Sequence, residues 1–376
     1  MGTERIDLLF DARHIRQSGI GTYIATLLPH LEQTFAAHGL SLAVLVAEHA
    51  APNLLASTTA VVEPEMAPMY SVAEQRVWRR AMNTVGPRGF WVPHYPFPLA
   101  ALTLGNRKPL LFSTVHDTLH AMSRAAGGHN INLARRMYAR MMLNLDARMC
   151  RRIFAPSDAT ASSLRAIAPA AAVTVTPIPV DDEWFKPADR TLSPVSGRYI
   201  LYVGNAKYHK NLPLLLEAYA EVAHRVPQRL VIAGSGEALR DSDERVAAMA
   251  ARHGDRVAVL GRLDFDVLRA LVASADLLVM PSRYEGAGLP PIEAMASHTA
   301  VLASDIPALR ETCGDGAQYF DPRDHRALAA LLAEYCLDDA ARDQLATSGW
   351  IHVNARQAAI SFDTAPRVVA AELARG

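Results

Sequence analysis

Short apolar runs alternate along the whole chain with longer stretches of helical character. This alternation favours an α/β protein, in which crossover helices join parallel strands. The candidate strands are Ile6–Phe10, Leu42–Val46, Leu110–Val115, Ile153–Pro156, Val173–Pro177, Tyr199–Val203, Leu230–Ala233, Val257–Leu260, Leu277–Met280 and Ala300–Ala303. These are too many strands for one sheet of ordinary size, and a chain of 376 residues is long enough for two domains.

The passage Asp181–Gly197 is rich in proline and acidic residues and precedes a new strand at Tyr199. Passages of this composition commonly connect domains. We therefore expect an amino-terminal domain over residues 1–190 and a carboxyl-terminal domain over residues 191–376. The last helix is a candidate to return to the first domain.

The charge balance excludes one large class of function. The chain carries 38 basic and 38 acidic residues, and so lacks the basic excess of a nucleic-acid-binding protein. The longest uncharged run, Gly89–Asn106, contains three prolines that break any membrane-spanning helix. Because the first residues are charged and form no signal-peptide core, we expect a cytoplasmic protein. Three widely spaced cysteines, Cys150, Cys313 and Cys336, are expected to be buried and unpaired.

Arginines are concentrated in one stretch, residues 124–152, where seven of them accompany a single acidic residue, Asp146. Methionines and a tyrosine are interleaved with these arginines. The stretch is therefore a candidate for peripheral contact with an anionic membrane at its inner face. The alternative is a long helix with a solvated arginine face over an ordinary core.

Lysine is scarce, and two of the four lysines lie close together. Lys207 and Lys210 follow the expected strand Tyr199–Val203 and precede a helix expected near Leu212. Ligands of parallel sheets bind beyond the carboxyl ends of the strands, and an ammonium beside a helix N-terminus there suits a diphosphate. A chance pair of surface lysines is the alternative.

A second chemical segment, Pro281–Ala296, follows the expected strand Leu277–Met280. Its glycines let the backbone approach a ligand closely, and its adjacent prolines fit the first turn of a helix. Glu285 stands in the loop and Glu293 in the helix, so that both carboxylates are expected to point into one cleft.

The pattern Glu285-x7-Glu293, in Glu-Gly-Ala-Gly-Leu-Pro-Pro-Ile-Glu-Ala-Met-Ala, resembles the donor-binding signature of the retaining glycosyltransferases of family 4. Nearly the whole chain is similar to this family, through Phe10–Arg13 with Ser18–Tyr23, Val115–Asp117, Ala155–Ser157, Val180–Pro187, Gly314–Ala317 and Phe320–Pro322. The resemblance implies the GT-B fold, an α/β architecture of two Rossmann-like doubly wound domains facing a central cleft.

The resemblance also implies roles for individual residues. Lys210 would bind the donor diphosphate and stabilise the leaving group, Glu285 would hold hydroxyls of the donor sugar, and His116 would lie near the reacting sugar. These are the expected catalytic residues. Further expected donor contacts are Gly19, Gly21, Asn205, Lys207, Gly234, Arg262, Gly286, Ala287, Gly288, Leu289 and Glu293, of which Glu293 would accept the ribose hydroxyls. Many relatives have an arginine where this chain has Asn205, and Lys207 is a candidate to replace its charge.

We expect no metal ion and no other cofactor, because lysine and helix N-termini can balance the charge of the diphosphate. Two Asp-x-Asp triplets imitate a metal-binding motif. Asp241–Asp243 is expected in a loop or a cap, and Asp264 is expected to cap a helix.

The implied function is transfer of a hexose, with retention, from a nucleotide-sugar to a saccharide or a lipid-linked oligosaccharide in the synthesis of a cell-surface polysaccharide such as lipopolysaccharide. Mannose from GDP-mannose is favoured, because Gly19–Tyr23 and Gly204–Asn211 resemble the corresponding segments of bacterial polysaccharide mannosyltransferases. A UDP-hexose-dependent transferase, a nucleotide-sugar epimerase of the same fold and a non-catalytic nucleotide-sugar-binding protein remain open.

Overall fold

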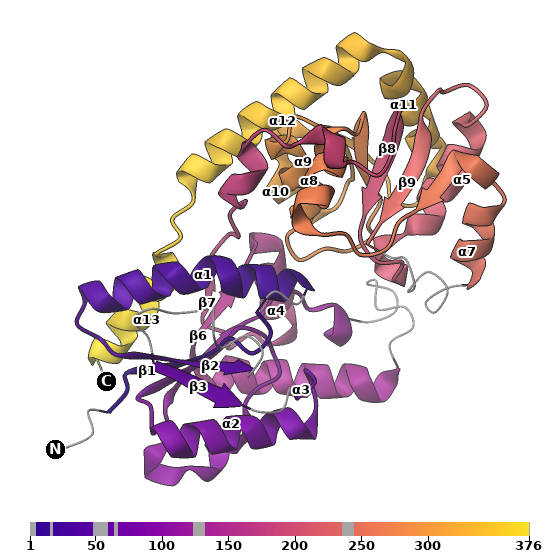
Figure 1. Cartoon of the computed structure of the whole chain (residues 1–376). Coiled ribbons are helices and arrows are strands. Elements are labelled where there is room, and N and C mark those ends of the chain that lie inside the picture. Colours follow the sequence, from indigo (N-terminus) through magenta and orange to yellow (C-terminus); the bar gives the residue numbers. More distant parts are fainter. Residues whose placement is uncertain are drawn as a thin grey trace. The chain divides into compact units, whose positions relative to one another are not determined.

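The computed structural model describes residues 5–15, 18–47, 59–63, 67–122, 132–234 and 244–375. These residues form two compact units, each with its own sheet (Figure 1). Unit 1 extends to Ile178 and resumes at Ser361, and unit 2 begins at Pro179 and ends at Ile360. The division at Ile178 comes before the boundary expected at residue 190, and the last helix groups with unit 1.

The sheet of unit 1 has seven parallel strands in the order β3-β2-β1-β4-β5-β6-β7. The strands are β1 (Leu8–Asp11), β2 (Leu42–Ala47), β3 (Thr59–Glu63), β4 (Gly89–Val92), β5 (Leu110–Thr114), β6 (Cys150–Ala155) and β7 (Val173–Val175). The strand order reverses between β1 and β4, which makes this the switch point of a doubly wound sheet.

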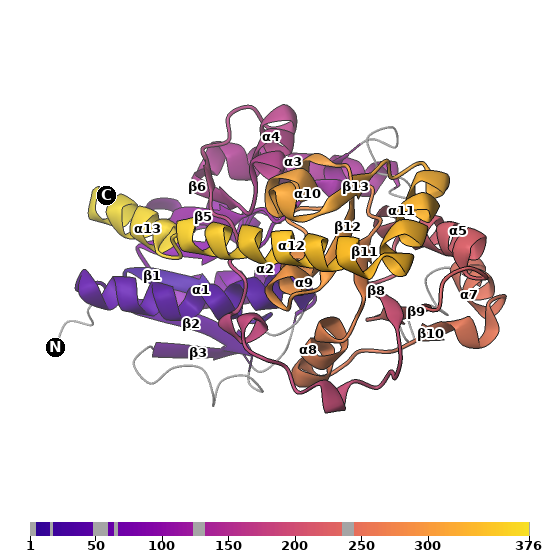
Figure 2. The ribbon, with the colours of Figure 1, turned by 90° about the horizontal axis from the view of Figure 1, so that it is seen from above.

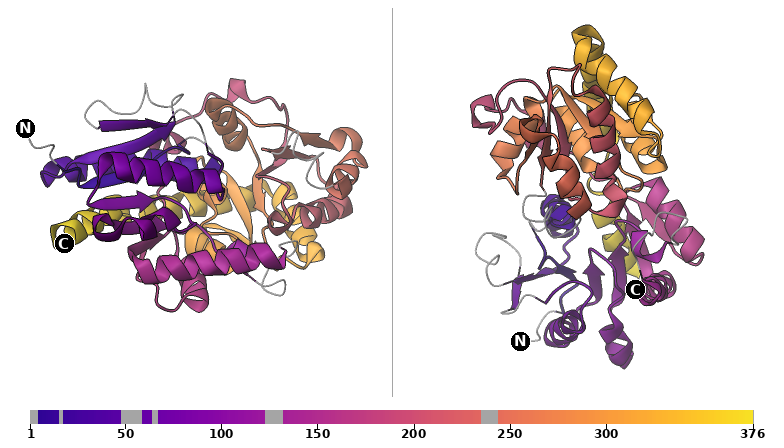
Figure 3. Two further views of the ribbon diagram at one scale, coloured as in Figure 1. Left: turned by 90° about the horizontal axis from the view of Figure 1, so that it is seen from below. Right: turned by 90° about the vertical axis from the view of Figure 1, so that its right-hand side faces the viewer.

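Helices cover both faces of this sheet. One face carries α1 (Ser18–Ala37) and α13 (Thr364–Arg375). The other carries α2 (Val72–Val85), α3 (Leu133–Met149) and α4 (Asp158–Ile167). Figure 1 shows α1 and α2 on opposite sides of the sheet, and the left panel of Figure 3 shows α2 and α3 from below. On the second face Trp78 of α2 and Met142 of α3 pack in one core with Leu9 and Phe90 of the strands.

The sheet of unit 2 repeats this plan with six parallel strands in the order β10-β9-β8-β11-β12-β13. The strands are β8 (Tyr199–Val203), β9 (Arg229–Ala233), β10 (Val257–Val259), β11 (Leu277–Met280), β12 (Ala300–Ser304) and β13 (Gln318–Phe320). Its switch point lies between β8 and β11.

Two hydrophobic cores hold the helices of unit 2 to the sheet, one on each face. The helices are α5 (Leu212–Val222), α7 (Glu244–Ala251) and α11 (His325–Leu337) on one face, and α8 (Phe265–Ala273), α9 (Leu289–Ala296) and α10 (Pro307–Cys313) on the other. The long helix α12 (Asp339–Ala359) packs against α9 and β12 (Figure 2). The α/β, doubly wound architecture expected from the sequence is thus confirmed.

The structure contains three strands that the sequence analysis did not expect, β3, β4 and β13. β4 lies within the uncharged, proline-rich run beginning at Gly89, and it is too short to be recognised from its sequence pattern. Its hydrogen bonds to the neighbouring strands β1 and β5 stabilise it. The three cysteines are buried and unpaired, as expected. Within the described part of the chain, no helix combines the length and the apolar character needed to cross a membrane.

Candidate functional site

The central feature of unit 2 is an ion pair between the loops that follow β8 and β11, the strands flanking the switch point. The Lys210 Nζ donates hydrogen bonds to Glu285 Oε1 and Oε2 at 2.8 and 3.0 Å. The Ser282 hydroxyl donates a third bond to Glu285 Oε1 at 2.6 Å. The structure therefore places two of the expected catalytic residues in direct contact, and adds Ser282, which the sequence analysis missed.

Asn211, the residue after Lys210, joins the loops that carry this pair. It has a left-handed backbone, with φ of 57°, and stands between the turn Tyr208–Lys210 and helix α5. Its side-chain amide donates to the carbonyls of Pro281 and Pro322, at 2.9 and 2.8 Å. Three loops at the carboxyl ends of strands are thereby joined through one buried side chain. The sequence signal was an asparagine at a helix start, a residue type that tolerates this conformation.

The glycine loop between Glu285 and α9 is tightly packed. Gly288 has a φ of 71°, and a Cβ atom there would lie 2.4 Å from Leu309 Cδ2. The Ala287 carbonyl accepts a hydrogen bond of 2.6 Å from the Thr312 hydroxyl. Helix α9 begins at Leu289 with its proline pair in the first turn, as the sequence predicts. Gly286, like Leu289, is partly exposed, so the loop presents backbone at both ends.

Glu293 lies one turn into α9 and is partly buried. Burial raises the pKa of its carboxyl group to about 7, and the negative charge of Asp181 adds to the effect. Among the described residues none donates a hydrogen bond to this carboxylate, so its charged form is poorly stabilised by the protein itself. A ligand with hydroxyl donors would stabilise it.

Four further expected donor contacts lie on three loops: Asn205 and Lys207 after β8, Gly234 after β9 and Arg262 after β10. The backbones of Gly204 and Gly234 approach each other, since a Cβ on Gly234 would lie 3.3 Å from the Gly204 carbonyl oxygen. The Asn205 side chain accepts from the Lys207 backbone N–H at 3.3 Å, which makes it a turn-forming residue. Arg262 is exposed.

Lys207 lines a pocket of about 210 Å³ beside Arg283, Arg323 and His325. Arg283 lies over the Tyr208 ring at 5.1 Å and donates to the Asn211 side chain at 2.8 Å. The two lysines of the loop therefore have different surroundings: Lys210 contacts the Glu285 carboxylate, and Lys207 lines a pocket that also contains Glu217 and two arginines.

In unit 1 the expected site residues are Gly19, Gly21 and His116. Both glycines lie in the first turn of α1, where Gly19 is exposed and Gly21 is buried. Tyr23 lies two residues after Gly21 on α1. Its ring contacts the His116 ring edge-on, with centroids 4.8 Å apart. The start of α1 and His116 are thus neighbours, as the expected roles require.

The His116 ring is held by the carbonyl of Pro93, which lies 2.8 Å from its Nε2. A carbonyl only accepts, so Nε2 carries the proton and Nδ1 is left as an acceptor. Burial lowers the pKa of His116 to about 4, although the Pro93 carbonyl and Asp117 oppose this effect. The ring is therefore neutral near pH 7. Asp117 accepts from the Leu119 backbone N–H at 2.9 Å.

A buried charged network, which the sequence analysis missed, lies at the switch point of unit 1. Arg13 forks onto Asp11 with bonds of 2.9 and 2.7 Å, and its Nη2 also lies 3.3 Å from Glu74 Oε1. His94 Nε2 lies 2.9 Å from the same Glu74 oxygen. Within the described residues, His14, Glu74 and His94 are the one group close enough to share a metal ion. The Arg13 guanidinium beside Glu74 opposes a cation there, so we read the group as an ion network.

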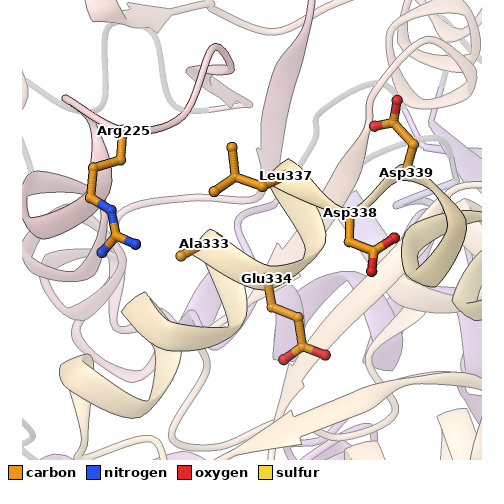
Figure 4. A pocket seen from close by; sticks show the side chains of 6 residues that line it. All are labelled: Arg225, Ala333, Glu334, Leu337, Asp338 and Asp339. Carbon is orange, nitrogen blue, oxygen red and sulfur yellow. The ribbon is translucent and has the colours of Figure 1, made fainter.

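A hollow at the corner between α11 and α12 is lined by Arg225 on one side and by Ala333 and Leu337 on the other (Figure 4). Two of its three acidic residues have structural partners: Asp338 caps α12, and Asp339 pairs with Arg198. None of the expected site residues lines it.

Some expected positions fall outside the described residues: Ser235 and Gly236 beside Gly234, the triplet Asp241–Asp243, and residues 124–131 of the arginine-rich stretch. Asp264 takes the N-cap position of α8, as expected, although its side chain makes no capping bond.

Residues 187–349 match the family model described as glycosyl transferases group 1. O-antigen chain mannosyltransferase RfbU of Salmonella typhimurium is 27% identical over 248 residues, which span 64% of this chain and 69% of that protein. O-antigen chain mannosyltransferase B of Escherichia coli is 33% identical over 148 residues, which span 39% of this chain and 38% of that protein.

Among solved structures, sucrose-phosphate synthase from Thermosynechococcus elongatus superposes with a TM-score of 0.73 at 21% identity, over 99% of this chain and 98% of its own. Anabaena Alr3699/HepE, solved with UDP and glucose, gives 0.74 at 18% identity, over 99% and 100%. These likenesses establish the fold, and the matched domain contains Lys210, Glu285 and Glu293. Residues 187–349 therefore form a glycosyl transferases group 1 domain, and the chain is a glycosyltransferase of the GT-B fold.

Proposed function

We propose that this glycosyltransferase is a retaining hexosyltransferase that uses a nucleotide-diphosphate sugar, with mannose from GDP-mannose as the favoured donor. The observation that carries the proposal is the Lys210–Glu285 pair at the switch point of unit 2. It puts an ammonium and a sugar-binding carboxylate within one hydrogen bond of each other. A sugar diphosphate has the matching order, with hydroxyls at one end and phosphate oxygens at the other.

In this proposal Lys210 stabilises the leaving group. As the bond between the anomeric carbon and the phosphate oxygen breaks, negative charge grows on the diphosphate. A lysine ammonium has three donors, so Lys210 can keep its bond to Glu285 and still donate to a phosphate oxygen. Glu285, oriented by Ser282, accepts from hydroxyls of the hexose.

The nucleoside is assigned to Glu293, whose ionised form needs donors that the described protein groups do not supply. Ribose hydroxyls are donors of the required kind. We further propose that His116, through Nδ1, accepts from a hydroxyl of the reacting sugar, and that Gly19 and Gly21 bring the start of α1 to the diphosphate.

No metal ion or other cofactor is required in this scheme. Lys210 supplies an ammonium that it shares with Glu285, and the N-terminus of α9 adds the partial charge of the N–H groups that its two prolines leave, those of Leu289 and Ile292. Activity that persists in EDTA would support this proposal, and activity that Mg²⁺ or Mn²⁺ restores after EDTA would contradict it.

Mannose is favoured by the names of the relatives, of which RfbU and mannosyltransferase B act in O-antigen chains. By the same reasoning the acceptor is a saccharide or a lipid-linked oligosaccharide of a cell-surface polysaccharide. A UDP-hexose is the alternative donor, because Anabaena Alr3699/HepE, which has a similar fold, was solved with UDP and glucose.

Calorimetry in EDTA tests the donor. We expect GDP and GDP-mannose to bind the wild-type protein, UDP and UDP-glucose to bind more weakly, and Glu293→Ala to lose binding. Lys186→Ala is the matched control, because that lysine lies in unit 2 and pairs with Glu183 on the surface. Preferential binding of the uracil nucleotides would replace GDP-mannose by a UDP-hexose, and equal binding by Glu293→Ala would overturn the role of Glu293.

We also propose that α3 makes a peripheral contact with an anionic membrane, at the inner face where a lipid-linked acceptor is presented. Leu133, Met137 and Met141 recur every four residues along α3 and are 61%, 62% and 52% exposed. Exposed arginines accompany this ridge, namely Arg135, Arg140 and Arg148. An apolar ridge flanked by cations suits the boundary between lipid headgroups and acyl chains.

Flotation with vesicles tests this contact. The protein should float with vesicles containing phosphatidylglycerol and remain behind with pure phosphatidylcholine. Met137→Ser with Met141→Ser should abolish flotation, whereas Leu337→Ser, at an exposed leucine of α11, should not. Equal flotation of all three proteins would contradict the assignment to α3.

A further inference from the structure

Tyr70 combines three properties that are rarely found together. It is a non-glycine residue with a φ of 65°, its side chain is 42% exposed, and its ring belongs to an aromatic cluster. A bulky residue in the left-handed region is strained, and an exposed ring recovers little of that cost by burial. Strain of this kind persists only where the surroundings enforce it, and it concentrates at functional sites.

The buried network of unit 1 enforces it. The Tyr70 backbone N–H donates to Glu74 Oε2 at 2.8 Å, while Ser71 caps the Glu74 N–H at 3.1 Å. The other oxygen of Glu74 is held by Arg13 and His94. Burial alone would raise the pKa of Glu74, but hydrogen bonds from His14 and His94 outweigh it and keep the pKa below its usual value. The buried carboxylate of Glu74 thus holds the Tyr70 backbone in its left-handed conformation.

The cluster around Tyr70 comes from the strand ends that also carry His116. The Tyr70 ring lies 5.3 Å from the Tyr95 ring and 6.2 Å from the His120 ring, between centroids. Tyr95 follows β4, and His120 follows β5 four residues after His116. The Pro93 carbonyl that holds the His116 ring stands two residues before Tyr95. β1 and β4 flank the switch point of this sheet, where ligands of doubly wound folds bind.

We propose that Tyr70, supported by the buried Tyr95 ring and flanked by the exposed His120, is the platform on which the acceptor saccharide stacks. This inference rests on the proposed function. A pyranose ring presents an apolar face of C–H groups and an equatorial edge of hydroxyls. The exposed Tyr70 ring offers an apolar face with a polar tip, and the exposed imidazole of His120 offers hydrogen bonds to hydroxyls. The platform belongs to unit 1, whereas the Lys210–Glu285 pair proposed for the donor belongs to unit 2, and so we assign the platform to the acceptor.

Saturation-transfer NMR tests the platform, with methyl α-D-mannoside and methyl α-D-glucoside as probes and GDP present. The wild-type protein and Tyr70→Phe should bind at least one probe. Tyr70→Ala should lose affinity at least tenfold, while its affinity for GDP stays within twofold. Trp350→Ala is the matched control, because that aromatic is 37% exposed and lies in unit 2 on α12. The proposal is overturned if no probe binds the wild-type protein, if Tyr70→Ala binds as the wild type does, or if Trp350→Ala loses as much.

Tyr70→Gly separates function from folding. Glycine adopts a φ of 65° without strain, so this variant should unfold at the same denaturant concentration as the wild type or a higher one, and still lose the probe. A variant that keeps the probe would contradict the platform. Failure of every protein to bind any nucleotide would instead count against the proposed function, because nucleotide binding does not depend on Tyr70.

Discussion

Lys210 donates to both carboxylate oxygens of Glu285, across the gap between the two strand ends at the switch point of unit 2. The pair is largely shielded from water, since the two side chains are 16% and 9% exposed. Removing either partner leaves the other charge partly buried and alone, which costs more than losing an exposed ion pair. The pair therefore stabilises the two loops through the same residues that are proposed to bind the donor.

Lys210→Ala should lower kcat/KM by a factor of about 10³, because one donor aimed at developing charge contributes about 3–4 kcal/mol to transition-state stabilisation. Lys210→Arg should recover part of this loss, since the charge is kept in a different shape. Steady-state kinetics with GDP-mannose and an acceptor extract would measure both. Lys186→Ala should behave as the wild type, and an equal loss there would show that the effect is not specific to Lys210.

The ionisation of Glu293 should change folding stability and nucleotide affinity with pH in opposite directions. Its folded-state pKa of about 7 lies above the ordinary value of 4.5, so the folded protein holds a proton that the unfolded chain releases. Stability is therefore lost as the pH rises from about 5 to about 8, by at most about 3 kcal/mol. Nucleotide affinity should rise over the same range, because the ionised carboxylate is the better acceptor for ribose hydroxyls.

Glu293→Gln checks both dependences, since glutamine stays neutral. Urea unfolding should show the variant becoming more stable than the wild type between pH 5 and pH 8. Calorimetry should show its nucleotide affinity unchanged with pH. A wild-type protein whose stability and affinity are both flat between pH 5 and pH 8 would contradict the raised pKa.

Gly288→Ala should destabilise unit 2 by about 2–4 kcal/mol, because the new Cβ atom meets both an unfavourable φ of 71° and Leu309 Cδ2 at 2.4 Å. Gly197→Ala is the matched control: its φ is 81°, but a Cβ atom there meets nothing within 4 Å. The control should lose only about 1 kcal/mol. Equal losses in denaturant titrations would show that strain, rather than the collision with Leu309, sets the cost.

The α/β architecture and the local structure around Glu285 could be predicted because their signals are local. A strand, a loop with two glycines and a proline-capped helix follow one another between Leu277 and Ala296, and the structure has the same order. Lys210 could be placed near Glu285 because its loop follows β8, the strand that pairs with β11. The carboxyl ends of neighbouring parallel strands lie at the same edge of the sheet.

The buried network of unit 1 could not be predicted, because its members are distant in the sequence. Arg13 and Glu74 are separated by 61 residues and Glu74 and His94 by 20, so that the pairing of β1 with β4 and the packing of α2 on the sheet are both needed to bring them together. β4 itself was missed, because four residues in a proline-rich run carry too little periodicity. The strained backbone of Tyr70 depends on that network, and no local signal marks it.

Asp146, on the inner face of α3, offers a test that is independent of the proposed activity. Its carboxyl group is fully buried, and its one described donor is the Cys150 thiol at 3.4 Å. Burial raises the pKa of Asp146 to about 8, so that the folded protein keeps it protonated at neutral pH. Since the unfolded chain ionises near pH 4, the wild-type protein loses stability as the pH rises from about 4 to about 8, by up to about 5 kcal/mol.

Asp146→Asn keeps the shape of the protonated acid and removes the titration. The variant should match the wild type at or below pH 4 in urea unfolding, and exceed its stability by several kcal/mol at pH 9. Asp266→Asn, at a side chain that is 74% exposed, should show no such crossover. If Asp146→Asn is less stable than the wild type at pH 7, the buried group is already ionised at neutral pH, and a polar partner must reach it within the core of unit 1.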